Sequence, residues 1–331
     1  MPDGWDSSTT GWRCRGAELQ SAEPQRGGAV EVHSPLLRKV GFVWRSGTGP
    51  ARATVRVWGD GSSPVSLLVH GTASSGRIWL KMLEMLKIPE HIPGTCGNEA
   101  PHGTFILPDL PGMGESDPIP GLAFGDWLEF VRQVASSGEV SSVARGVGGK
   151  VHLAGHSLGG AVAMHLAGED WVDSVALVAP ATRTFCLDMR RVCPPSSREG
   201  TILLRRVSGS LAHDPLSLTR EDAATLREDY GKAAPLLEGG LPWPDFLEDE
   251  ATLLAGKRVL VVWGEEDEVV APEYARSLLD SLLAHPAPAI HGVAAVRGVP
   301  VETVSLPGCG HVPMLERPAE LARILDGFWN R

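Results

Sequence analysis

Apolar runs of strand length alternate with amphipathic helical patterns along most of the chain. The runs cover residues 65–71, 104–109, 150–155, 172–181, 257–264 and 301–308. Apolar residues at helical spacing follow three of them: Trp79, Met82, Leu83 and Leu86; Trp127, Phe130, Val131 and Val134; and Leu321, Ile324, Leu325 and Phe328, after Pro318. Strands that alternate with helices predict an α/β fold, with a mainly parallel central sheet and helices on both of its faces.

The first part of the chain departs from this alternation. Residues 1–35 are rich in Gly, Ser, Pro and charged residues and show little periodicity, which indicates a mobile N-terminal extension. Residues 37–44 and 53–59 are typical of strands, and the Gly- and Pro-containing stretch 45–52 between them is typical of a turn. We therefore expect a hairpin where the folded core begins.

A long insertion separates two of the predicted strands. Residues 182–256 are far more than a crossover connection needs, so we expect them to form a substructure of their own. Within this insertion, residues 218–231 predict a helix that Thr219 caps and Gly231 ends. The remaining segments, 36–181 and 257–331, then make up the core.

Composition argues against nucleic-acid binding, a disulfide framework, a zinc site and a membrane span. The 331 residues carry a formal net charge of -10 without a cluster of Lys and Arg, which argues against nucleic acid as a partner. Five scattered cysteines contain no CxxC pair, so neither a disulfide framework nor a zinc site is indicated. No apolar run approaches the roughly 20 residues of a membrane span, and no secretory signal is visible. We expect a soluble, cytoplasmic protein without a cofactor or metal, and the oligomeric state stays open.

The stretch GHSLGG places a serine between a strand and a helix. A strand that ends in G-x-S-x-G and continues as a helix is typical of a nucleophile elbow, a turn too tight for side chains at its flanking positions. Gly155 and Gly159 occupy those positions around Ser157. A serine hydroxyl needs a base and an acid that orients the base, and in this architecture they follow in the order acid, then histidine. Four carboxylates at residues 265–268 and His311 follow later strands.

Five motifs in this order resemble those of the α/β-hydrolase superfamily over roughly residues 36–331: LLVHG, DLPGMGESD, GHSLGG, WGEEDEVVAP and GCGHVPMLERP. The resemblance implies the α/β-hydrolase fold with a helical cap at 182–256. It also implies a catalytic triad of Ser157 as nucleophile, Asp267 as acid and His311 as base. Asp267 fills the D of the family's W-G-x-x-D loop, which favours it over Glu265, Glu266 and Glu268.

The same resemblance assigns roles to backbone groups near the elbow. The N–H groups of Thr72 and Leu158 would form the oxyanion hole, because they follow HG and the nucleophile, respectively. His70, Gly71 and His156 would have structural roles beside the site.

These expectations point to a serine hydrolase that forms an acyl-enzyme. We expect its substrate to be a mostly apolar small molecule carrying a carboxylic ester, thioester or lactone. The alternatives are a carbon-carbon bond hydrolase, a perhydrolase, a non-hydrolytic cyclase or lyase, and a ligand receptor, since this fold hosts many chemistries.

Overall fold

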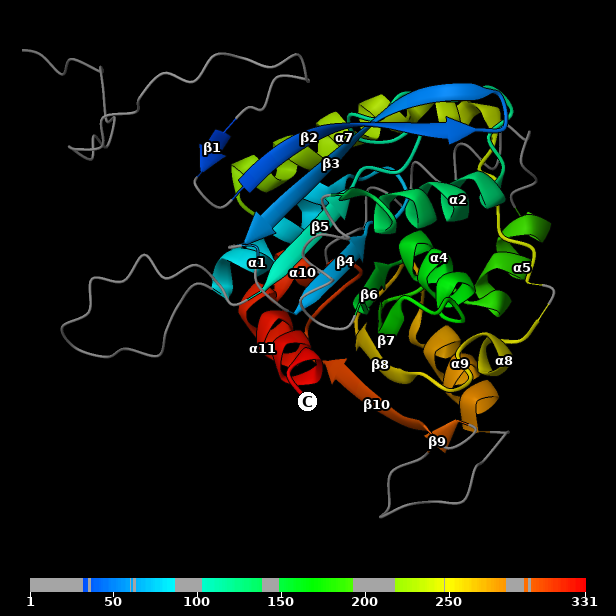
Figure 1. Cartoon of the computed structure of the whole chain (residues 1–331). Coiled ribbons are helices and arrows are strands. Elements are labelled where there is room, and N and C mark those ends of the chain that lie inside the picture. Colours follow the sequence, from blue (N-terminus) through cyan, green and yellow to red (C-terminus); the bar gives the residue numbers. More distant parts are fainter. Residues whose placement is uncertain are drawn as a thin grey trace, which may run out of the picture.

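The computed structural model describes residues 32–34, 37–59, 61, 64–86, 103–138, 149–192, 218–246, 248–283, 295–296 and 299–331. Within these residues the strands join in one ten-stranded sheet of order β1-β2-β3-β5-β4-β6-β7-β8-β10-β9 (Figure 1). Their bounds are β1 Val32–Ser34, β2 Leu37–Ser46, β3 Gly49–Gly59, β4 Val65–Val69, β5 Thr104–Pro108, β6 Val151–His156, β7 Val172–Val178, β8 Arg258–Gly264, β9 Ala295–Val296 and β10 Val299–Leu306.

The centre of the sheet is parallel, as the sequence predicts. Strands β5, β4, β6, β7, β8 and β10 pair in parallel, whereas β3 pairs antiparallel with both β2 and β5. The side chains of β4 and β6 are buried throughout, because the parallel strands have helices on both faces. This arrangement confirms the expected α/β-hydrolase fold.

Helices cover the two faces of the sheet. One face packs against α2 (Phe124–Ala135), α4 (Leu158–Leu166) and α9 (Pro272–Leu283). The other packs against the 3-10 helix η1 (Gly76–Trp79) and against α1 (Leu80–Met85), α10 (Pro313–Glu316) and α11 (Pro318–Trp329). The helices α1, α10 and α11 lie together in Figure 1. The predicted helical faces of α2 and α11 are buried except for Ile324, which is partly buried. Periodicity therefore located these helices correctly.

The N-terminal hairpin is longer than predicted. Strands β2 and β3 pair from Leu37 with Trp58 to Ser46 with Gly49, so most of the predicted turn 45–52 belongs to the strands. The Ser46 hydroxyl donates to the Gly49 carbonyl and closes a turn of only two residues, which explains why the connection is shorter. Residues 32–34, predicted as part of the extension, form the edge strand β1, and residues 1–31 lie outside the described residues.

The segment between β7 and β8 contains α5 (Arg183–Val192), α7 (Arg220–Gly239) and α8 (Glu250–Leu253), and residues 193–217 lie outside the described residues. Thr219 caps α7, as predicted, by accepting a hydrogen bond from the Asp222 N–H. The predicted end at Gly231 is wrong, because α7 continues through Pro235 to Gly239. Ala233 and Leu237 are buried on this extension, so tertiary packing outweighs the helix-breaking tendency of Gly and Pro.

Candidate active site

Ser157 lies in a strained turn at the carboxyl end of β6. Its φ of 51° and ψ of -118° fall in a region that non-glycine residues rarely adopt, at a cost of about 1–3 kcal/mol. A Cβ added to Gly155 would lie 2.1 Å from the Gly159 carbonyl oxygen, and one added to Gly159 would lie 2.3 Å from the Val69 carbonyl oxygen. Only glycine fits at both positions, so the strand, the turn and α4 approach closely enough to hold the serine in this conformation.

Replacement of Gly159 by alanine is expected to destabilise the fold by about 3 kcal/mol or more, because the new methyl group would collide with backbone carbonyls of β4 and His70. Thermal and urea unfolding of the purified variant measure the loss. Gly168→Ala is the matched control, since nothing lies within 4 Å of its added Cβ just beyond α4. Equal stability of Gly159→Ala and the wild type would contradict the packing described here.

His311 and Asp267 are joined by a buried hydrogen bond. The His311 Nδ1–H donates to Asp267 Oδ2 at 2.8 Å, and both side chains are at most 2% exposed. The other carboxylate oxygen of Asp267 accepts the N–H groups of Val269 and Val270 at 2.8 and 2.9 Å. The carboxylate is therefore fixed from two sides, and it selects the His311 tautomer whose Nε2 carries the free lone pair.

The neighbouring acidic residues are placed differently. Glu265, Glu266 and Glu268 are exposed, whereas Asp267 between them is buried against His311. Cys309, two residues before His311, is buried, and burial raises the pKa of its thiol to about 12. The thiol is therefore protonated at neutral pH and is a poor nucleophile.

His156 is hydrogen-bonded to the backbone of His311. Its Nε2–H donates to the His311 carbonyl oxygen at 2.7 Å, and the two rings lie 4.8 Å apart between centroids. Complete burial, followed by the proximity of His311, lowers the pKa of His156 well below its usual 6.5. A neutral His156 adds no positive charge beside His311. Its hydrogen bond to the His311 carbonyl oxygen fixes the backbone of the loop that carries His311.

The segment after β4 passes directly beside the elbow. A Cβ on Gly71 would lie 2.9 Å from Ser157 Cβ, so glycine allows the two turns to approach. His70 accepts the Leu110 N–H at Nε2 and donates from Nδ1 to the Gly71 carbonyl oxygen at 2.7 Å. Burial lowers the pKa of His70, which keeps the imidazole neutral as this bonding pattern requires.

Two backbone N–H groups near Ser157 stay available. Neither the Thr72 N–H nor the Leu158 N–H has a hydrogen-bond partner among the described residues. The adjacent N–H, that of Ala73, is already bonded to Met113 Sδ at 3.3 Å, and Ala73 has a φ of 55°. Thr72 and Leu158 are thus the open donors of their turns, which suits stabilisation of a developing negative charge.

Two residues that hold this site, Asp109 and Met113, received no role from the sequence although both lie in the DLPGMGESD stretch. Asp109 lies in the DLPGMGESD stretch and accepts the Gly76 N–H at 2.8 Å, the Glu115 N–H at 2.9 Å and an Arg56 N–H at 2.6 Å. This buried carboxylate ties the segment after β4 to the loop after β5. Its place in a motif could have drawn attention to it, but the thioether contact of Met113 could not have been foreseen.

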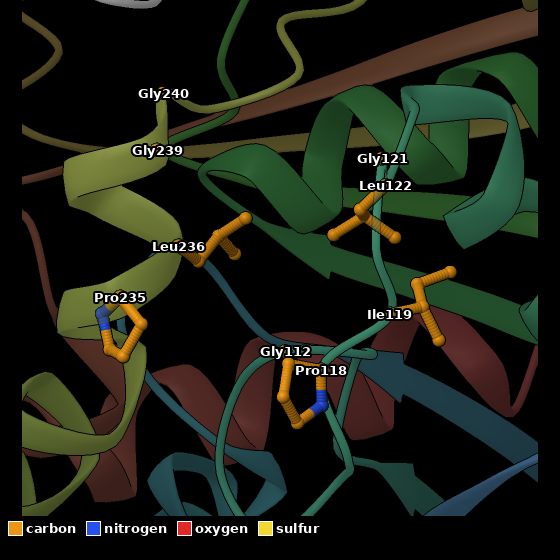
Figure 2. A pocket seen from close by; sticks show the side chains of 9 residues that line it. All are labelled: Gly112, Pro118, Ile119, Gly121, Leu122, Pro235, Leu236, Gly239 and Gly240. Carbon is orange, nitrogen blue, oxygen red and sulfur yellow. The ribbon is translucent and has the colours of Figure 1, made fainter.

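A cavity of about 300 Å³ opens between α7 and the loop after β5. Figure 2 shows Leu236 of α7 and Ile119 and Leu122 of the loop around this space. Gly112 also lines it and is followed directly by Met113, which contacts Ala73. The largely apolar cavity is therefore lined by the residue directly before Met113, whose sulfur accepts the Ala73 N–H in the segment after β4.

The described residues contain no group of three or more His, Cys, Asp or Glu side chains that could hold a metal ion. No helix in the same residues is long and apolar enough to cross a membrane.

Comparisons with known proteins concern the family and the fold. The family model described as "Alpha/beta hydrolase family" matches residues 67–324. The chain is 27% identical over 281 residues to a dihydrolipoyllysine-residue acetyltransferase component of the acetoin cleaving system of Pseudomonas putida, with 82% of this chain and 65% of that protein covered. The chain therefore spans less than two thirds of that relative's length.

Solved structures share the fold at low sequence identity. A thermophilic esterase from Thermogutta terrifontis has a TM-score of 0.60 at 21% identity, covering 88% of this chain and 98% of that one. The 2-hydroxy-6-oxo-6-phenylhexa-2,4-dienoate hydrolase from Rhodococcus sp. strain RHA1 has a TM-score of 0.58 at 19% identity, covering 92% of this chain and 100% of that one. Both are similar in architecture.

Proposed function

The chain belongs to the alpha/beta hydrolase family, and on this premise we propose that it is a serine hydrolase that cleaves a carboxylic ester of a mostly apolar small molecule. The observation that carries the proposal is the buried hydrogen bond between Asp267 and His311, set at the same sheet edge as the strained Ser157. A packed structural histidine would not need a buried carboxylate fixed by two further N–H groups.

Acylation begins at Ser157. The Nε2 lone pair of His311 takes the hydroxyl proton while Oγ attacks the carbonyl carbon of the substrate. The Thr72 and Leu158 N–H groups stabilise the oxyanion of the tetrahedral intermediate, and neither has another hydrogen-bond partner in the part of the chain that the structure describes. The imidazolium then gives its proton to the leaving alcohol, and the acyl group stays on Ser157.

Deacylation repeats these steps with water. His311 removes a proton from the water that attacks the acyl-enzyme, and the acid product leaves when the proton returns to Ser157. Asp267 stays ionised throughout and stabilises the imidazolium in both halves of the reaction. The residues alone supply this chemistry, so we propose no cofactor.

The apolar character of the substrate is supported by the cavity between α7 and the loop after β5, which has Ile119, Leu122 and Leu236 in its lining. The segment 182–256, to which α7 belongs, is proposed as a helical cap that excludes water from the site. An acetyltransferase component and an esterase are among the proteins similar to this chain, which is consistent with the proposed ester cleavage, and the similar dienoate hydrolase keeps the carbon-carbon bond alternative in the test below.

The proposal is tested with a matched substrate panel: 4-nitrophenyl esters of rising acyl length, a thioester, a lactone and a β-diketone, each with the wild type and Ser157→Ala. We expect the oxygen esters to be cleaved fastest, with an optimum at an intermediate acyl length, because the acyl chain must fit a bounded apolar space. Steady-state kcat/KM values provide the ranking.

The other outcomes distinguish the alternatives. Preferred cleavage of the β-diketone would assign the chain to carbon-carbon bond hydrolysis, and peroxide-dependent oxidation would assign it to perhydrolysis. Ester cleavage that survives Ser157→Ala would exclude the acyl-enzyme. Binding without turnover of any substrate would favour a cyclase, lyase or receptor and would contradict the proposal.

A further inference from the structure

A buried carboxylate of α7 reaches the segment that carries the Thr72 N–H. The Ser75 hydroxyl donates to Asp229 Oδ2 at 2.6 Å, and the Arg77 guanidinium forms an ion pair with Asp229 Oδ1. Ser75 and Asp229 are at most 1% exposed, although they lie 154 residues apart in the chain. The sequence showed Asp229 only as one of several charged residues on a helix.

Within the described part of the chain, the Thr72 N–H has no hydrogen-bond partner to orient it, so its neighbours must do so. The oxyanion segment, residues 72–76, is bonded at Ala73 to Met113, at Ser75 to Asp229 and at Gly76 to Asp109. Ala73 has a positive φ, and a strained conformation of this kind persists only when the surroundings determine it fully. The contact of Ser75 with Asp229 is the one of these three that comes from α7.

Another ion pair connects α7 to the same region, and neither of its two residues belongs to the oxyanion segment. Lys81 of α1 contacts Asp222 of α7 at 2.7 Å, one to two helical turns from Arg77 and Asp229. Both Asp222 and Asp229 attach α7 to the fold, but only Asp229 also accepts a hydrogen bond from a residue of the oxyanion segment, Ser75. The ion pair of Lys81 with Asp222 therefore provides a control for effects that come only from the attachment of α7.

We propose that Asp229 is a positioning residue that fixes the Thr72 N–H in the oxyanion hole through Ser75. The inference rests on the proposed function, because it assumes that Thr72 stabilises an oxyanion. Asp229 lies in α7, outside the segments predicted as the core. When α7 packs against the segment after β4, the Asp229 carboxylate accepts the Ser75 hydroxyl and so fixes the oxyanion segment. Asp229 itself does not touch the substrate.

The test compares Ser75→Ala, Asp229→Asn and the control Lys81→Met. Ser75→Ala removes the hydroxyl that bonds Asp229 but keeps both partners of the Asp229–Arg77 ion pair. It also removes the acceptor of the Arg77 N–H at the start of η1, so Asp229→Asn, which keeps that cap, is compared with it. We expect kcat on the best ester to fall about 10- to 100-fold in both test variants, with KM changed less than twofold, because a small displacement of an oxyanion donor acts on the transition state. Lys81→Met is expected to keep kcat within about twofold of the wild type.

Two further measurements separate positioning from a general loss of packing. Affinity for a boronic acid, which forms a tetrahedral adduct with the serine, is expected to fall in parallel with kcat in the test variants. Hydrogen exchange of the peptide that covers residues 72–79 is expected to speed up in the same variants and to stay unchanged in Lys81→Met.

The outcomes also distinguish this inference from the proposed function. Unchanged exchange at residues 72–79, an unchanged kcat, or an equal loss in Lys81→Met would overturn the positioning role even if the wild type is an esterase. A wild type without turnover, combined with faster exchange only in Ser75→Ala and Asp229→Asn, would support the structural role of the contact and would overturn its catalytic consequence together with the proposed function.

Discussion

Ser157→Ala is expected to lower kcat/KM for ester cleavage by about 10⁴- to 10⁶-fold, because the variant has no atom that can form the acyl-enzyme. Any residual rate would come from substrate binding and from the oxyanion donors. The initial rate of 4-nitrophenol release, measured at the same protein concentration for both proteins, gives this ratio.

The variant is expected to stay folded. The Ser157 side chain makes no capping hydrogen bond, whereas its backbone N–H donates to the Val178 carbonyl and its own carbonyl accepts the Gly160 and Ala181 N–H groups. Ser66→Ala is a matched control, since Ser66 is a buried serine of β4 whose hydroxyl has no hydrogen-bond partner among the described residues. Comparable losses in Ser66→Ala and Ser157→Ala would mean that general packing, rather than nucleophilic attack, accounts for the effect.

Asp267→Asn is expected to lower kcat by about 10⁴-fold through a change of tautomer. The asparagine oxygen can still accept the Val269 and Val270 N–H groups, which directs the amide NH₂ toward His311 Nδ1. Nδ1 must then accept instead of donate, so the proton moves to Nε2, and His311 can no longer take the proton of Ser157. Burst and steady-state kinetics across pH 5 to about 9 measure the loss.

Exposed neighbours of Asp267 provide the control. Glu265→Gln and Glu268→Gln change residues on the same loop that lie on its exposed side, and we expect both to keep kcat within about twofold of the wild type. A large loss in Glu268→Gln together with an active Asp267→Asn would show that the acid of the site had been assigned to the wrong carboxylate.

The local patterns in the sequence predicted the features that depend on short stretches of chain. Gly155 and Gly159 lie on either side of Ser157 within five residues, and both are glycine because an added Cβ would collide with neighbouring backbone. The strand that ends before Asp267 and the one that ends before His311 are both apolar runs, and parallel strands bring their carboxyl ends to one edge of the sheet. The order of the motifs was therefore enough to assemble the candidate triad.

Features that depend on contacts between distant segments were not predictable in this way. Nothing near Asp229 indicates that it is buried against Ser75, because the partner is on another element and the surrounding residues are those of a solvated helix. The end of α7 was misplaced for the same reason, since the packing of Ala233 and Leu237, rather than local propensity, extends the helix past Gly231. The predicted hairpin turn was too long because Pro50 resembles a loop residue, whereas it lies in the part of β3 that pairs with β2 before the pairing with β5 begins.

Covalent labelling of Ser157 tests the proposed mechanism most directly. The full-length wild type is treated with a fluorophosphonate, digested, and mapped by tandem mass spectrometry over the peptide that contains residues 151–166, with His311→Ala treated in parallel. We predict one phosphonyl group per chain, attached to Ser157, and strongly slowed labelling without the His311 imidazole. An unlabelled Ser157 in a protein that turns over esters, or a label on another residue, would contradict the assignment of this serine as the nucleophile.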